Sequence, residues 1–204
     1  MSYRVGLIQT RTPASHEAAL AHVAPLVRQA AAGGARFIAT PEGTNILQKD
    51  RAQLLPQLRR PEDDPVVTGL TGLAGELGVW LLIGSALVLR DDGQAANRAM
   101  LAGPDGRIHA AYDKLHMFDV DLPTGESARE SAAYTAGDRA VTARADELKL
   151  GLTICYDMRF PALYRSLALA GAEVMTVPSA FTRPTGAAHW EILLRARAIE
   201  TGSF

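Results

Sequence analysis

Three residues that could act together in hydrolysis each stand at the end of a predicted strand. Cys155 ends the run LKLGLTIC, Glu42 follows FIATP, and Lys114 closes RIHAAYDK. In open α/β sheets ligands bind outside the carboxyl ends of the strands, so we expect Glu42 and Cys155 to share one edge of a sheet. A thiolate can attack a carbonyl, a carboxylate can move protons, and an ammonium can stabilise an oxyanion.

Each of these residues also has an ordinary structural interpretation. Free cysteine is among the most buried residue types, so Cys155 alone is more often a core thiol than a reagent. Glu42 alone suits a loop, and Lys114 alone suits a surface ion pair with Asp113, which contributes little stability. The case for chemistry therefore depends on the three occurring together.

Histidine is the usual base for a cysteine nucleophile, which makes a cysteine peptidase the main rival enzyme. His109, His116 and His189 are the candidates, and no spacing links any of them to Cys155. Both schemes stay open on the residues alone.

Composition narrows the class of protein. The 204 residues carry 21 basic and 22 acidic side chains with no long run of either sign, which argues against a nucleic-acid or acidic-membrane partner and favours a small molecule. The single cysteine excludes an intrachain disulfide and a cysteine-based metal cluster. The first residues, MSYRVGLIQT, lack the pattern of a secretory signal, so we expect a cytoplasmic protein.

Apolar runs and helical patterns alternate along the chain, which predicts a layered α/β domain. A helix capped by Ser15 and ended by Gly33 should connect strands at residues 4–9 and 36–41, with Pro25 kinking or breaking it. The remaining predicted helices cover residues 64–77, 162–170 and 187–200. The remaining predicted strands cover residues 79–89, 140–144, 148–156 and 173–177, with a hairpin around Pro104-Asp105-Gly106.

The segments TPEGTN, YDKLHMFDVDLPTGE and LTICYDMRFP together resemble the nitrilase, or carbon–nitrogen hydrolase, family, whose Glu-Lys-Cys triad occurs in this order. GAEVMTVPSAFT and TGAAHWEILLRARAIE extend the resemblance over essentially the whole chain. It implies an α/β fold, an α-β-β-α sandwich that pairs into a homodimer or higher homo-oligomer, with no metal and no organic cofactor.

The same resemblance assigns roles to residues. It implies that Cys155 is the nucleophile, that Glu42 is the general base and acid, and that Lys114 stabilises the oxyanion together with the Tyr156 backbone N–H. A second glutamate helps to position substrate and lysine in many members. Glu130 is our preferred counterpart, with Glu126 as the competing assignment.

Within the family, LHMFDVDLP and SAFTRPTGAAHWE most resemble the branch that hydrolyses deaminated glutathione, followed by the omega-amidases of 2-oxo acids. Arg159 and Arg183 are candidates to bind a substrate carboxylate, since arginine binds carboxylates bidentately. Ser179 and Phe181 complete the expected substrate contacts. Hydrolysis of nitriles or N-carbamoyl compounds, or a catalytically silent binding or scaffold role on the same fold, are the alternatives.

The end of the sequence predicts one more feature. Gly202 suits the C-cap of the last helix, and Phe204 resembles the first residue of a further strand. We therefore expect residues 1–204 to form a single carbon–nitrogen hydrolase domain that lacks its C-terminal strands.

Overall fold

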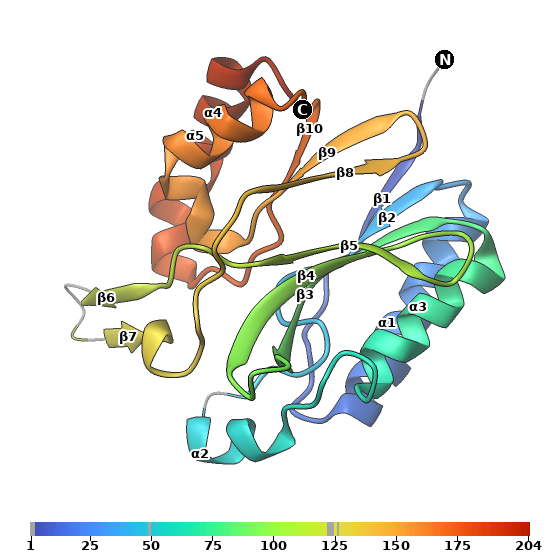
Figure 1. Cartoon of the computed structure of the whole chain (residues 1–204), viewed down its shortest axis with the longest axis horizontal. Coiled ribbons are helices and arrows are strands. Elements are labelled where there is room, and N and C mark those ends of the chain that lie inside the picture. The colour runs from blue at the N-terminus through green and yellow to red at the C-terminus, as the bar shows by residue number, and fades with distance from the viewer. Residues whose placement is uncertain (1–2, 49, 122–124, 126) are drawn as a thin grey trace.

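A computed structural model describes residues 3–48, 50–121, 125 and 127–204. They form two principal sheets packed face to face, with helices on both outer sides (Figure 1). The first sheet has the order β1-β2-β3-β4-β5, and its strands are Val5–Leu7, Phe37–Ala39, Trp80–Leu89, Ala95–Ala102 and Ile108–Asp113. The second has the order β10-β9-β8, and its strands are Val174–Thr176, Leu148–Leu152 and Val141–Ala145.

The helices supply the outer layers. Helices α1 (His16–Ala32) and α3 (Pro65–Leu77) lie against the five-stranded sheet, and α4 (Pro161–Leu169) and α5 (Arg183–Thr201) lie on the side of the three-stranded sheet. Between the sheets, Phe37, Leu82 and Leu101 pack with Leu150 and Leu152. The predicted α-β-β-α sandwich is therefore confirmed.

Shorter elements occupy the loops that border the site. They are α2 (Arg51–Leu54), η1 (Leu55–Gln57), the two-stranded pair β6 (Asp119–Asp121) and β7 (Ser127–Arg129), and the 3-10 turns η2 (Glu130–Ala132) and η3 (Cys155–Arg159). Their length explains why the sequence pattern did not predict them, since an element of three to five residues shows no periodicity.

The predicted break at Pro25 is wrong, because α1 runs through this residue without interruption. Proline removes the hydrogen bond that its N–H would donate to the carbonyl four residues earlier, here that of Ala21. Pro25 and Ala21 are both exposed, whereas Val23 and Val27 face the core. The freed carbonyl is therefore on the solvent side, where water can replace the missing donor.

Two predicted boundaries also need correction. The strand predicted over residues 148–156 ends at Leu152, and Cys155 lies in the turn η3. The helix predicted from residue 187 begins at Arg183, because Thr182 caps it and Pro184 occupies its first turn, where a missing N–H costs nothing.

At its last residues the chain returns to the three-stranded sheet. Gly202 has the left-handed conformation expected of a C-cap, with φ 63°. The Phe204 N–H donates to the Glu173 carbonyl at 2.9 Å, and the Met175 N–H donates to the Phe204 carbonyl at 2.7 Å, so Phe204 lies beside β10 in parallel register. The expectation of further strands stays a prediction. A membrane-spanning segment needs a long apolar helix, and none of the helices in the described residues meets both conditions.

Candidate active site

Glu42 lies in the turn after β2, and a bulge in β3 holds this turn in place. The Gly43 N–H donates to Ser85 Oγ at 2.9 Å, and the Thr44 N–H donates to the Ser85 carbonyl at 2.8 Å. The backbones approach so closely that a Cβ atom at Gly84 would lie 1.9 Å from the Thr40 carbonyl oxygen. Glycine at position 84 is therefore required for the Glu42 turn to pack against the sheet.

Cys155 begins η3 with a φ of 48°, a left-handed conformation that side-chain-bearing residues rarely adopt. Its N–H donates to the Pro178 carbonyl at 2.9 Å, and Asp157 closes the turn by accepting the Ile154 N–H at 2.9 Å. The surroundings thus enforce a strained backbone at a buried thiol, a combination that clusters at functional sites.

The electrostatic environment keeps the Cys155 thiol protonated at rest. Burial raises the pKa of this thiol well above its usual value, and the negative charge of Glu42 raises it further. The positive charge of Lys114 acts in the opposite direction and does not overcome these effects. A base is therefore needed to take the proton when the sulfur attacks, and Glu42 is a carboxylate that lines the same cavity.

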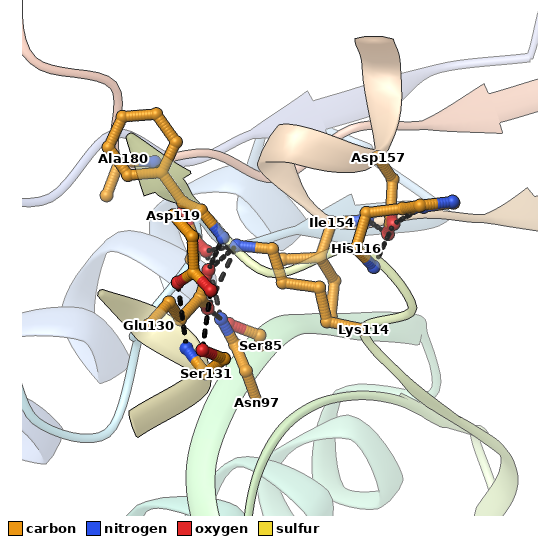
Figure 2. A network of polar contacts seen from close by, with 12 residues as sticks. Ser85, Asn97, Lys114, His116, Asp119, Glu130, Ser131, Ile154, Asp157 and Ala180 are labelled. Atoms are coloured by element: carbon orange, nitrogen blue, oxygen red, sulfur yellow. Dashed lines mark hydrogen bonds and ion pairs between the residues drawn. The ribbon is translucent and has the colours of Figure 1, made fainter. Parts of the chain in front are cut away.

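Lys114 follows β5 and is 2% exposed. Its Nζ lies 3.2 Å from Glu42 Oε1. It also lies 3.0 and 2.8 Å from the two carboxylate oxygens of Glu130 (Figure 2). Burial alone would lower the pKa of Lys114, but the negative charges around it, that of Glu42 first, raise it above its usual value. The ammonium therefore stays charged inside the protein.

Glu130 starts η2 and accepts the Phe118 N–H at 2.7 Å in addition to its two contacts with Lys114. Asp119 holds the same loop by accepting from the backbone N–H and the hydroxyl of Ser131 at 3.0 and 2.5 Å (Figure 2). Glu126, the competing assignment, lies outside the described residues. The structure thus places Glu130 beside Lys114, as the resemblance to the family predicted.

These four side chains line one cavity of about 320 Å³. Tyr156 and Phe181, two of the predicted substrate contacts, also line it. Most of the remaining wall is apolar or aromatic, and includes Leu54, Leu87, Phe118, Ala128, Ala133 and Tyr134. A cavity of this size with a few polar groups on one wall suits a small organic substrate.

The other predicted substrate contacts are not part of this cavity wall. Ser179 and Arg183 line a second hollow of about 640 Å³, because Arg183 begins α5 on the side of β1 and β10. Arg159 instead donates from Nη2 to His189 Nδ1 at 3.1 Å. The structure therefore does not bring the two predicted carboxylate-binding arginines to Cys155.

Six polar residues of the wall were missed by the sequence analysis: Gln48, Arg51, Asn97, Arg129, Thr182 and Thr185. Asn97 had one available signal, since it is an amide within the apolar strand NRAMLAG. Arg51 lies in a helix too short to be predicted, and Arg129 is adjacent to Glu130.

The three histidines considered as bases for Cys155 do not line this cavity. His116 donates its backbone N–H to Asp157 at 3.0 Å, its Nδ1 lies 2.7 Å from the same carboxylate, and its ring stacks on Phe160 with centroids 3.5 Å apart. His109 contacts Asp105, and no histidine of the described chain lines the cavity. The geometry therefore gives the peptidase alternative no base.

A buried thiol shares the cavity with a carboxylate and an ammonium, and no histidine of the described residues lines it, so a carboxylate is the available base in place of the usual imidazole. Residues 4–204 match the model of the carbon–nitrogen hydrolase family, and the chain belongs to that family.

Several individual proteins to which the chain is similar are amidases by name. The chain is 39% identical over 170 residues to a deaminated glutathione amidase of Yersinia enterocolitica, covering 82% of this chain and 59% of that protein. It is 33% identical to the human omega-amidase NIT2, covering 98% and 71% of the two chains. A solved amidase from Nesterenkonia sp. AN1, a glutamate-to-glutamine mutant with acrylamide added at its active site cysteine, superimposes with a TM-score of 0.83 at 27% identity, covering 99% and 76%.

Proposed function

We propose that this protein is an amidase that hydrolyses the C–N bond of a small amide to a carboxylic acid and ammonia, or to a carboxylic acid and an amine where the amide is substituted. The observation that carries the proposal is the junction of Glu42, Lys114 and Cys155 on one cavity wall, with Lys114 Nζ 3.2 Å from Glu42 Oε1. The amidase names of the relatives support it. The chain spans 59% of the length of the Yersinia relative, so the activity of the whole protein stays a proposal.

The first half-reaction forms a thioester. Glu42 takes the Cys155 proton while the sulfur attacks the amide carbon, and the resulting oxyanion is stabilised by Lys114 and the Tyr156 N–H. Glu42 then transfers the proton to the leaving nitrogen. The C–N bond breaks, ammonia departs from a primary amide or an amine departs from a substituted amide such as deaminated glutathione, and the acyl group stays on sulfur.

The second half-reaction returns the enzyme to its starting state. Glu42 deprotonates a water molecule, the hydroxide attacks the thioester carbon, and the C–S bond breaks as the thiolate recovers the proton. Glu130 keeps Lys114 charged and in place through both halves, with contacts at 2.8 and 3.0 Å.

The substrate that we propose carries a carboxylate on its acyl side, as deaminated glutathione and 2-oxo acid omega-amides do. Arg51 lines the cavity, donates to the Arg129 and Ala132 carbonyls, and has no carboxylate partner in the described part of the chain. Arg129 is already paired with Asp121 at 2.7 Å. Arg51 is therefore the better placed of the two to bind an anionic group.

Ammonia release from a panel of amides, nitriles and N-carbamoyl compounds tests the proposal. We expect turnover of amides, an acyl adduct on the peptide containing Cys155, and no turnover by a folded Cys155→Ala variant. Turnover of nitriles or N-carbamoyl compounds alone would favour the other chemistries of the family. Binding without turnover of any compound would favour a silent scaffold. A cytoplasmic location and self-association stay predictions.

A further inference from the structure

Asn97 contacts three of the four polar residues of the proposed site. It lies in β4 and is 3% exposed. Its Nδ2 donates to Glu130 Oε1 at 3.2 Å (Figure 2) and to Glu42 Oε1 at 2.9 Å. Its backbone carbonyl accepts the Lys114 N–H at 2.9 Å. One amide group thus connects the two carboxylates that share the single ammonium.

The direction of this amide is determined by its neighbours. If the group were rotated by half a turn, the carbonyl oxygen would face two carboxylates, which accept hydrogen bonds and cannot donate them when ionised. In the observed orientation Asn97 Oδ1 is buried without a hydrogen-bond partner among the described residues. An unpaired buried carbonyl is costly. An apolar side chain would fill this position without burying an unpaired oxygen. The function of Asn97 therefore lies in the two N–H bonds of its amide group, which donate to Glu42 and Glu130.

Glu42 depends on Asn97 more than Glu130 does. Glu130 has two contacts with Lys114 at 2.8 and 3.0 Å and one with the Phe118 N–H. Glu42 has a single, longer contact with Lys114 at 3.2 Å and one with the Ala180 N–H at 2.8 Å. Without Asn97, the only donor to Glu42 Oε1 among the described residues would be Lys114, which lies closer to Glu130 than to Glu42.

We infer that Asn97 is a positioning residue, which holds the Glu42 carboxylate in the orientation that exchanges protons with Cys155 and separates it from Glu130. This role rests on the proposed amidase function. It predicts a loss of rate in the chemical step, because substrate binding does not involve the bridge.

The test compares Asn97→Ala and Asn97→Asp with the wild type and with Asn45→Ala. For Asn97→Ala we expect kcat to fall about 10- to 100-fold at nearly unchanged KM, since bonds to charged groups are the stronger ones. The acid limb of the rate profile should move to higher pH, because the ionised carboxylates lose a donor. Asn97→Asp keeps the shape, and it should recover activity as pH falls, since the introduced carboxyl group can donate only when it is protonated.

Asn45 is the matched control because it is also a buried asparagine whose Nδ2 has two partners. These are Asp64 at 2.7 Å and the Leu87 carbonyl at 2.9 Å, and Asn45 contacts neither carboxylate of the site. Asn45→Ala should lower the melting temperature and leave the acid limb in place. A kcat loss in Asn97→Ala that merely follows its loss of stability, with an unmoved acid limb, would overturn the inference.

A second readout separates this inference from the proposed function. The rate at which iodoacetamide alkylates Cys155 can be followed without any amide substrate. In Asn97→Ala its pH profile should move to lower pH, because a displaced Glu42 carboxylate repels the thiolate less. If the wild type turned over no amide, the proposed function would fail, and an unmoved alkylation profile would separately refute the positioning role.

Discussion

Replacing Glu42 with glutamine should make Cys155 more reactive towards an alkylating agent while it removes turnover. Burial and the Glu42 charge raise the pKa of the Cys155 thiol, and the Lys114 charge lowers it. Glutamine keeps the shape of the side chain and removes the charge. The pKa of the thiol should therefore fall in Glu42→Gln and rise in Lys114→Met.

The size of the effect follows from Coulomb's law for a charge that lines the same cavity as the thiol. A unit charge about 4 Å away contributes about 4 kcal/mol at an effective dielectric constant of about 20. This corresponds to roughly three powers of ten in the thiolate fraction. Thiolate nucleophilicity falls as its pKa falls, with a Brønsted coefficient of about 0.4–0.5. The alkylation rate at neutral pH should therefore rise about 10- to 100-fold, whereas amide turnover should fall about 10²- to 10⁴-fold, because an amide side chain cannot carry the proton.

The assay is the rate of iodoacetamide addition to the Cys155 peptide, followed by mass spectrometry across the neutral and alkaline range. Glu147→Gln is the control, because this glutamate is more than half exposed and pairs with Arg36 away from the cavity. It should react as the wild type does. If Glu42→Gln reacted at the wild-type rate or more slowly, the Glu42 charge would not control the thiol, and the proton-transfer role of Glu42 would lose its physical basis.

Two further predictions concern the walls of the site. Gly84→Ala should lower the free energy of unfolding by about 3 kcal/mol, because its Cβ would meet the Thr40 carbonyl. Gly72→Ala, at an exposed position inside α3 with nothing within 4 Å, should instead raise it by about 0.5–1 kcal/mol, because alanine favours a helix interior. A urea midpoint of Gly84→Ala equal to that of the wild type would show that the β3 bulge yields to the methyl group. Arg51→Met should raise KM for a carboxylate-bearing amide about tenfold and leave KM for a neutral amide unchanged, and an equal effect on both would exclude Arg51 as the carboxylate contact.

The sequence predicts well what depends on local pattern. Ser15 accepts the Ala18 N–H at 3.3 Å, and Asp64 accepts the Val66 and Val67 N–H groups at 2.8 and 3.1 Å, so both helix starts could be predicted from the capping residue alone. Cys155 shows the limit. Residue type favours an ordinary strand conformation there, and the observed left-handed backbone depends on the Pro178 carbonyl, which belongs to a later part of the chain.

The expected common sheet edge of Glu42 and Cys155 is wrong, and the reason shows what sequence reasoning lacked. Glu42 follows β2 and Lys114 follows β5 in the five-stranded sheet, whereas Cys155 follows β9 in the three-stranded sheet. Strands β2 and β3 are parallel and β3, β4 and β5 alternate in direction, so the carboxyl ends of β2 and β5 reach the same edge. The thiol approaches them from the opposite sheet, because the face-to-face packing of Phe37 and Leu82 on Leu150 and Leu152 brings that sheet over the edge.

The expectation that ligands bind at the carboxyl ends of strands was stated for a single sheet, and it still selected residues that line the cavity. It did so because strand ends from both sheets open into the same cavity. It could not predict Asn97, which lies near the beginning of a strand and enters the site only because β4 runs antiparallel to its neighbours.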